Sequence, residues 1–197
     1  MKRIVLHWTA GGHRANGTDK RHYHVIIEGD GTVVRGNSPI SANAHISRPN
    51  DGSTYAAHTR GLNTGSIGVA VAAMRGAVER PFSAGPSPIT PAQVDKLVEV
   101  VTDLCREYGI PVTPETVLTH AEVQPRLGVT QRNKWDISWL PGMTRAGDPL
   151  AIGDGLRDRI SAAMRPAPVL GQLPGKPHNA PSGGIWALLA RLFGGRK

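Results

Sequence analysis

The segment from Ser66 to Ala73 is apolar almost without interruption, and it constrains the fold more than any other feature of the sequence. Such a run is typical of a central strand that is covered on both faces, as in sheets flanked by helices. Shorter apolar segments predict further strands at Arg3–Trp8, Tyr23–Glu28, Thr32–Gly36 and Thr116–Thr119. Gly29-Asp30-Gly31 indicates a tight hairpin between Tyr23–Glu28 and Thr32–Gly36. The sequence therefore predicts a sheet of at least four strands.

Helical spacing is clearest in the segment that begins at Thr90. Thr90 is a suitable N-cap, Pro91 fits the first helical turn, and Gly109 ends the pattern. The apolar positions between them are Val94, Leu97, Val98, Val101, Leu104, Cys105 and Tyr108. A closing helix is expected over residues 154–164. With 24 Gly, 16 Pro and only 5% aromatic residues, the pattern favours a loop-rich α/β fold with a mixed central sheet flanked by helices.

The composition changes after the predicted closing helix. Residues 165–184 are rich in Pro and Gly and nearly devoid of large apolar residues, which is typical of a linker. Beyond them a short amphipathic helix is predicted from the spacing of Ile185, Leu188, Leu189, Leu192 and Phe193. We therefore expect one domain over 1–164, a linker over 165–184 and a basic amphipathic tail over 185–197. The tail would suit an anionic membrane surface, packing on the domain or an oligomer contact.

The formal net charge of +8 is distributed unevenly, because residues 165–197 contain five cations and no acid. A nearly balanced domain with a short basic tail disfavours a nucleic-acid partner. The single cysteine, Cys105, excludes an internal disulfide framework and a site built from several cysteines, and its place on the apolar helical stripe assigns it to the core. Neither a signal-peptide pattern nor a membrane-spanning apolar run is recognisable, so we expect synthesis in the cytoplasm.

Two of the eight histidines have matching surroundings. His7 and His120 each follow a short apolar strand and precede a loop, which is where open α/β sheets tend to place their sites. A carboxylate, Asp136, lies in a later polar loop. Two imidazoles and one carboxylate would leave the fourth position of a zinc ion open, as in a catalytic site. The alternative is that both histidines are structural, and their spacing alone does not decide between the two.

Six segments of the chain have counterparts in a known family. They are VLHWTA at 5–10, HYHVIIEGDGTVVRG at 22–36, AAHTRGLNTGSIGVAV at 56–71, ITPAQVDKL at 89–97, LTHAEV at 118–123 and KWD at 134–136. In this order they resemble the type 2 zinc amidases of peptidoglycan, which include phage lysozyme-type amidases, wall-recycling amidases and peptidoglycan recognition proteins. The resemblance covers most of residues 1–140. It implies the amidase and recognition-protein fold, with hydrolysis of the amide between the muramic acid lactyl group and L-alanine.

The resemblance also assigns roles to individual residues. His7, His120 and Asp136 match the three Zn²⁺ ligands, in the branch of the family that carries aspartate at the third position. Lys134 matches the lysine that faces the developing oxyanion, and Tyr23 matches the tyrosine near the water that zinc activates. Both are therefore expected to be catalytic.

Substrate contacts are expected in the segment at 56–71. The resemblance suggests His58 as a residue of the substrate groove, and Asn63 and Thr64 could hydrogen-bond the glycan or the stem peptide. Only a short segment separates His7 from Tyr23. The helix that relatives place there should be reduced or absent, and we expect Gly11–Lys20 to be a loop.

Three functions are compatible with these residues. The first is a phage or prophage endolysin, a monomer made in the bacterial host cytoplasm and acting on the cell wall after release. Its tail over 185–197 would contact an anionic membrane or lipopolysaccharide. The second is a cytosolic amidase that recycles soluble muropeptides, which leaves the tail unexplained. The third is a non-catalytic peptidoglycan-binding module, although such members typically lack a zinc ligand.

Overall fold

The computed structural model describes residues 1–47 and 55–165, and the remaining residues are outside this description. The predicted linker over 165–184 therefore lies outside it except for Arg165, and the predicted tail over 185–197 lies outside it entirely. In the described part of the chain, no helix is long and apolar enough to cross a membrane.

A five-stranded sheet in the order β3-β2-β4-β1-β5 forms the centre of the fold. Its strands are β1 (Arg3–Trp8), β2 (Val25–Ile27), β3 (Val33–Arg35), β4 (Ser66–Val71) and β5 (Val117–Thr119). β1 pairs in parallel with β4 and β5, β2 pairs in parallel with β4, and β2 and β3 form the antiparallel hairpin. Every residue of β4 is buried, as its continuous apolar run predicts. The predicted mixed sheet is confirmed.

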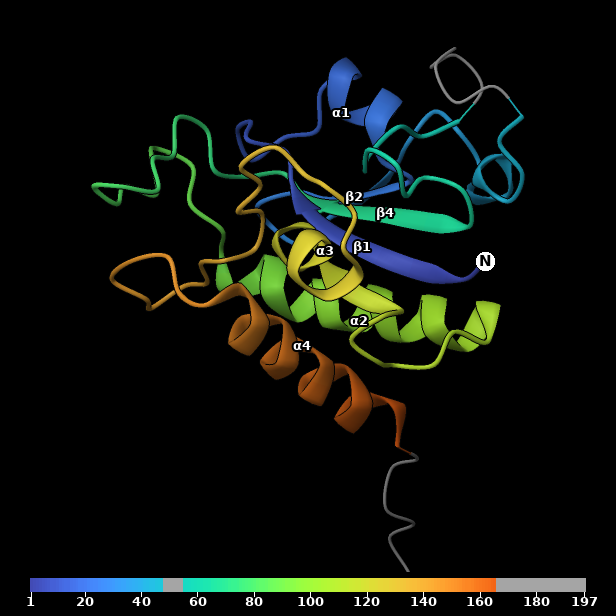
Figure 1. Ribbon diagram of the computed structural model, residues 1–197. Helices are drawn as coiled ribbons and strands as arrows, with labels where there is room; N and C mark the ends of the chain where they lie inside the picture. The colour runs from blue at the N-terminus through green and yellow to red at the C-terminus, as the bar shows by residue number, and fades with distance from the viewer. Residues whose placement is uncertain (48–54, 166–197) are drawn as a thin grey trace, which may run out of the picture. The chain divides into compact units, whose positions relative to one another are not determined.

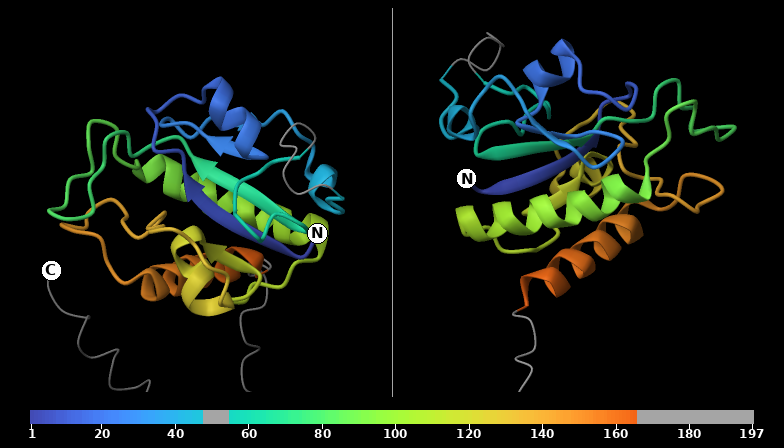
Figure 2. Two further views of the ribbon diagram at one scale, coloured as in Figure 1. Left: turned by 45° about the horizontal axis from the view of Figure 1, so that its top comes forward. Right: turned by 180° about the vertical axis from the view of Figure 1, so that it is seen from behind.

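Two long helices lie together on one side of the sheet (Figure 1; Figure 2). Helix α2 (Pro91–Tyr108) packs against β4 and β2, and α4 (Pro149–Met164) packs against α2 and β5. The predicted ends of α2 are confirmed, because Thr90 caps its first turn and Gly109 adopts the left-handed conformation after its last. Helix α4 begins five residues before the expected residue 154, because Asp148 caps it and Pro149 occupies its first position.

The main core fills the space between the sheet and these two helices. Its buried members include Ile4, Leu6, Trp8, Leu97 and Cys105, so the assignment of the cysteine to the core is confirmed. Burial raises the pKa of the Cys105 thiol to about 11. A smaller cluster contains Val5, Leu62, Leu118 and Val123. Because side chains alternate along a strand, β1 sends Ile4, Leu6 and Trp8 to one face and Val5 and His7 to the other.

The segment between β1 and β2 contains a short helix, α1 (Gly17–His22), on the side of the sheet opposite α2 (Figure 1). The expectation of a loop over Gly11–Lys20 is therefore wrong for its last four residues. Asn16 accepts hydrogen bonds from the backbone N–H groups of Thr18 and Asp19, and the Asp19 side chain accepts from the Asn16 backbone. This capping box makes six residues helical despite their polar composition. The helix is reduced, as the short spacing between His7 and Tyr23 suggested.

Two further elements connect the sheet to the site. A 3₁₀ helix, η1 (Ile40–Asn43), precedes β4, and α3 (His120–Leu127) starts directly after β5. Because β1 and β5 are parallel neighbours, their carboxyl ends lie at the same edge of the sheet. His7, near the end of β1, and His120, at the first position of α3, are thereby brought together.

Candidate metal centre

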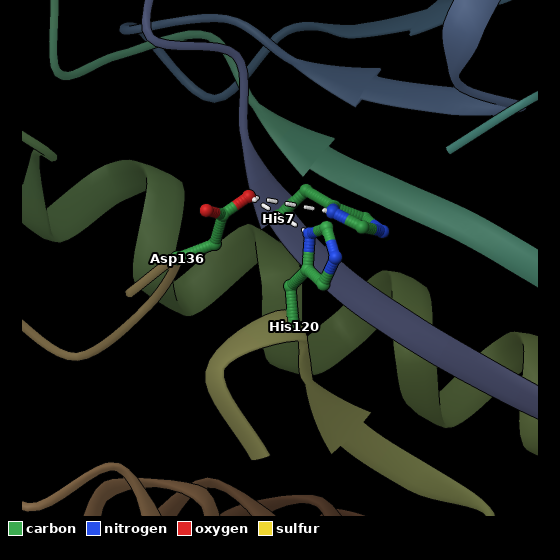
Figure 3. A group of neighbouring side chains, drawn as sticks. All are labelled: His7, His120 and Asp136. Atoms are coloured by element: carbon green, nitrogen blue, oxygen red, sulfur yellow. Dashed lines mark hydrogen bonds and ion pairs between the residues drawn. The ribbon is translucent and has the colours of Figure 1, made fainter. Parts of the chain in front are cut away.

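Three side chains converge at the carboxyl ends of β1 and β5 (Figure 3). His7, His120 and Asp136 are all buried, and each offers one ligand atom within 4.8 Å of the others. Asp136 Oδ2 lies 3.5 Å from His7 Nδ1 and 3.3 Å from His120 Nδ1. In Figure 3 both imidazole rings turn a nitrogen toward this oxygen. The structure thus brings together the three residues that the sequence suggested as ligands.

The donor set fits a zinc ion. His7 is fully buried, yet its Nδ1 has no hydrogen-bond partner, which is uncommon for a buried polar atom and is explained if it binds a metal. Two imidazole nitrogens and one carboxylate oxygen form a recognised catalytic zinc set that leaves the fourth position open. An open position would admit water or substrate.

The charge states of these groups also suit a metal. Burial lowers the pKa of His7 to about 4, so its imidazole is neutral near pH 7. A neutral imidazole and an ionised carboxylate are the forms in which these residues bind metals.

Asp136 is held in place by its neighbours along the chain. Trp135 packs edge-on against Trp8, with ring centroids 4.6 Å apart, so the residue before Asp136 contacts the residue after His7. Ile137, which follows Asp136, is fully buried and adopts a left-handed conformation with φ of 61°. That conformation is unfavourable for a β-branched residue, and such backbone strain persists only where the surroundings enforce it. The loop is therefore fixed on both sides of the ligand.

A buried ionic cluster between α3 and α4 holds His120 in place. Glu122 is fully buried, and its carboxylate accepts hydrogen bonds from the Thr119 backbone N–H at 2.8 Å and from Arg157 Nη2 at 2.8 Å. Arg126 Nε donates to the same carboxylate at 2.7 Å. A Cβ atom at Gly153 of α4 would overlap the Glu122 carboxylate, so only glycine permits this approach. The start of α3, and with it His120, is thus fixed to α4.

Tyr23 is half-buried beside the cluster, with its ring centroid 5.1 Å from that of His7. Its hydroxyl donates to the Trp8 carbonyl oxygen at 3.4 Å. Burial, together with the charges of Asp136 and Asp19, raises the pKa of Tyr23 above its ordinary value. The phenol therefore keeps its proton and acts as a hydrogen-bond donor.

A cavity of about 550 Å³ opens next to His120. Its lining includes the exposed Lys134 and the three predicted substrate contacts His58, Asn63 and Thr64. Two further cations, Arg60 and Arg132, line the same cavity. The structure thus gathers these sequence-predicted residues around one ligand of the cluster, and the cavity is cationic.

The predicted substrate contacts differ in what else they do. Asn63 Oδ1 accepts the backbone N–H groups of His58 at 3.0 Å and Thr59 at 2.8 Å, so this oxygen shapes its own loop. Thr64 is exposed. His58 is buried, and its Nδ1 lies 3.2 Å from His7 Nε2. Burial, followed by the neighbouring His7, holds the pKa of His58 well below its usual range.

Several residues that shape the centre were not predicted from the sequence. Gln131 contacts His120, the tryptophan pair braces the loop, and Glu122 with Arg157 anchors α3. Of these, only Glu122 has a local signal, because a carboxylate three residues after Thr119 is the pattern of a capping box. The other contacts join residues that are distant in the sequence.

Comparisons with known proteins bear on this site. The family model described as N-acetylmuramoyl-L-alanine amidase matches residues 1–142. No curated protein sequence matches the chain significantly.

Solved structures give distant similarities. N-acetylmuramoyl-L-alanine amidase LysC from Clostridium intestinale is 20% identical over 79% of this chain and 84% of its own, with a TM-score of 0.45. The endolysin from a Thermus scotoductus bacteriophage is 22% identical over 66% of this chain and 73% of its own, with a TM-score of 0.40. AmiD from E. coli, solved with the substrate anhydro-N-acetylmuramic acid-L-Ala-D-gamma-Glu-L-Lys, is 22% identical over 61% of this chain and 48% of its own, with a TM-score of 0.41.

Proposed function

This chain belongs to the N-acetylmuramoyl-L-alanine amidase family, and we propose that it is a zinc enzyme that cleaves the amide between the muramic acid lactyl group and L-alanine in peptidoglycan. One observation carries the zinc dependence. His7, His120 and Asp136 offer ligand atoms within 4.8 Å of one another, and His7 Nδ1 is buried there without a hydrogen-bond partner. A binding module that recognises peptidoglycan without cleaving it has no need of such an open ligand set.

The chemistry that zinc supplies when bound is Lewis-acid activation of the amide carbonyl and of a water molecule. Lys134 contributes a fixed positive charge to the cavity that His120 lines, where it stabilises negative charge developing on the carbonyl oxygen. Tyr23 stays protonated, because burial and nearby carboxylates raise its pKa. Its hydroxyl can therefore orient the water molecule by donating a hydrogen bond to it. Lys134 thus stabilises the developing negative charge, and Tyr23 orients the water molecule.

The cationic cavity suits the peptide part of the substrate. Arg60, Arg132 and Lys134 line it, and the stem peptide of peptidoglycan carries free carboxylates. His58, Asn63 and Thr64 line the same space and are our proposed substrate contacts. Thr64 is the one among them that is exposed.

Metal analysis of the purified protein, combined with mass spectrometry of its sacculus digest, tests this function. We expect about one zinc per chain, free stem peptides that begin with L-alanine, and glycan strands with unsubstituted lactyl groups. Asp136→Ala and His120→Ala should lose zinc and activity together. Activity retained by His120→Ala, or retained after chelator has removed all metal, would refute the metal centre.

We further propose that the protein is an endolysin, made as a monomer in the cytoplasm of a bacterial host and released to the wall. The basic amphipathic pattern of residues 185–197 supports this role, because it suits contact with an anionic membrane or lipopolysaccharide. Replacing Leu188 and Leu192 by aspartate should impair lysis of outer-membrane-bearing cells more than hydrolysis of purified sacculi. Equal effects on both, or a preference for soluble muropeptides over sacculi, would contradict the endolysin role.

A further inference from the structure

The Nε2 atoms of both histidine ligands have hydrogen-bond partners inside the protein. His120 Nε2 lies 2.9 Å from Gln131 Oε1, and His7 Nε2 lies 3.2 Å from His58 Nδ1. A neutral imidazole carries one proton, and the partner of one nitrogen decides whether the other is free for a metal. The neighbours of Nε2 therefore control whether Nδ1 is ready to bind.

The orientation of the Gln131 side chain is fixed by its surroundings. Its Nε2 donates to the Arg60 carbonyl oxygen at 2.9 Å and faces the Val129 carbonyl oxygen at 3.4 Å. Because carbonyl oxygens only accept hydrogen bonds, the amide nitrogen must face them, and the amide oxygen must face His120. That oxygen in turn only accepts, so the proton of the His120 ring belongs on Nε2 and leaves Nδ1 bare.

A second acceptor competes for the same proton. Asp136 Oδ2 lies 3.3 Å from His120 Nδ1 and would draw the proton to the nitrogen that must bind the metal. The contact to Gln131 is shorter, at 2.9 Å, and it is made to a side chain that is itself anchored. The Gln131 backbone N–H donates to Gln124 Oε1 at 2.8 Å, and the residue is buried. The geometry therefore favours Gln131 over Asp136.

From these contacts we propose that Gln131 is a positioning residue that holds His120 in the tautomer with Nδ1 free for the metal, before any metal arrives. The inference rests on the proposed function, because it concerns the same metal centre. Gln131 acts through His120. It also ties the ligand to the wall of the substrate cavity, since its amide nitrogen binds the Arg60 carbonyl oxygen.

The proposal does not extend to His58, the partner of the other ligand. His58 Nδ1 faces both His7 Nε2 at 3.2 Å and Thr59 Oγ1 at 2.8 Å, so two groups share one acceptor. His7 is, however, a useful internal reference, because Gln131 does not contact it in the structure. A change at Gln131 should leave the His7 tautomer as it is.

Nitrogen-15 NMR of the histidine rings in the full, metal-free chain at pH 8 tests the proposal. His120 signals are assigned by comparison with His120→Ala. In the native sequence we expect the Nε2–H form for His120. In Gln131→Met, which removes the acceptor at similar length, the proton should move to Nδ1 while His7 is unchanged. Competition with a chromophoric chelator should show zinc binding weakened about 10- to 100-fold.

Two variants separate positioning from a general structural effect. Gln131→Glu keeps an acceptor for His120 Nε2 but loses the N–H groups that face the Arg60 and Val129 carbonyl oxygens, so it should retain the Nε2–H form and bind zinc more tightly than Gln131→Met does. Gln124→Met removes the anchor of the Gln131 backbone but leaves its side-chain oxygen, and the His120 tautomer should stay that of the native sequence. A merely structural role predicts the same loss in all three variants.

An Nδ1–H form of His120 in the native sequence overturns the proposal, and this result does not depend on any variant folding. Unchanged tautomer and zinc affinity in Gln131→Met overturn it as well. If the native protein binds no zinc but Gln131→Met still moves the proton, the proposed zinc function fails and the role of Gln131 stands.

Discussion

The two candidate histidine ligands lie on regular secondary structure, whereas Asp136 and Lys134 lie on an irregular loop. β1, which carries His7, is hydrogen-bonded to strands on both sides, and His120 begins a helix directly after a strand. The loop instead contains two residues in the left-handed conformation that are not glycine, Asn133 and Ile137. One half of the centre is thus held by the sheet, and the other half by side-chain packing.

Substitutions in the two halves should therefore have different effects on the protein. The regular half is continuous with the core, because Glu122 and Arg157 join α3 to α4 within the buried interior. The loop half depends on local contacts such as the Trp8–Trp135 pair. Substitutions in the regular half should therefore change the stability of the whole domain, and substitutions in the loop should change mainly metal binding or turnover, with at most a small loss of stability.

The strongest test of the regular half is Glu122→Ala. It leaves Arg157, whose side chain is 7% exposed, without its buried partner and with the exposed Asp154 as its remaining carboxylate. Removing one partner of a buried ion pair costs about 3–5 kcal/mol of unfolding free energy. Urea denaturation measures this loss, and zinc affinity should fall with it. Glu99→Ala, which breaks an exposed pair with Lys96, is the matched control and should cost about 0–1 kcal/mol. Similar losses of unfolding free energy in the two variants would contradict the idea that the buried ionic cluster stabilises the regular half.

Lys134→Met is the corresponding test of the loop half. It removes the fixed charge that we propose faces the developing oxyanion, so kcat should fall by about 10²- to 10³-fold. Because Lys134 is exposed, the unfolding free energy and the zinc content should not change. Steady-state kinetics with metal analysis measures both. Lys96→Met, on the surface of α2, controls for the loss of one positive charge. A Lys134→Met protein that also unfolds more easily would contradict a purely local role.

The pH dependence of stability tests how much one buried residue of the sheet region contributes. This residue is His24, which is buried beside β4. Its Nδ1 accepts from the Gly68 backbone N–H, and burial lowers its pKa from 6.5 to about 4. As the pH falls from about 7 to 4, the unfolded chain takes up the proton first, so this contribution to stability is present above pH 6.5 and is lost toward pH 4. The loss amounts to about 3 kcal/mol at most.

His24→Gln keeps one acceptor and one donor but cannot titrate. Urea denaturation at pH 7 and pH 4.5 should therefore give a smaller difference for this variant than for the native sequence. Equal pH dependence in the two proteins would show that His24 does not contribute.

The smallest effect is expected for Trp135→Leu, which removes the edge-on contact with Trp8. An aromatic pair contributes about 0.5–1.5 kcal/mol beyond its buried area. Zinc affinity should also weaken, because Asp136 is the next residue. Phe82→Leu removes a stacked contact with Trp139 and is the control for loss of an aromatic pair away from the ligands. Weaker zinc binding in both variants would argue against a specific brace.

The same division explains what the sequence could predict. The strand that carries His7, the strand that precedes His120, the caps of α2 and the mixed sheet follow from local patterns, and the structure confirms them. The family was identified from six ordered motifs, and the match over residues 1–142 confirms it. Helix α1 was missed because its signal is a capping box in a polar segment.

The loop half was less accessible to prediction. Asp136 was a candidate from its place in a polar loop, but its role as a ligand, and the role of Lys134, were assigned through the family resemblance, since neither residue follows a strand. Gln131, with its contact to His120, could not be found from spacing, because the contact depends on how a loop folds back onto α3. The predicted tail over 185–197 lies outside the described residues and stays a prediction.

The close approach of Gly153 to the Glu122 carboxylate has a consequence for evolution. Any side chain at position 153 collides with a carboxylate that α3 needs, so substitutions there should destabilise the fold as long as glutamate occupies position 122. A smaller residue at position 122 removes that obstacle. We therefore expect divergent sequences of this architecture to change the two positions together.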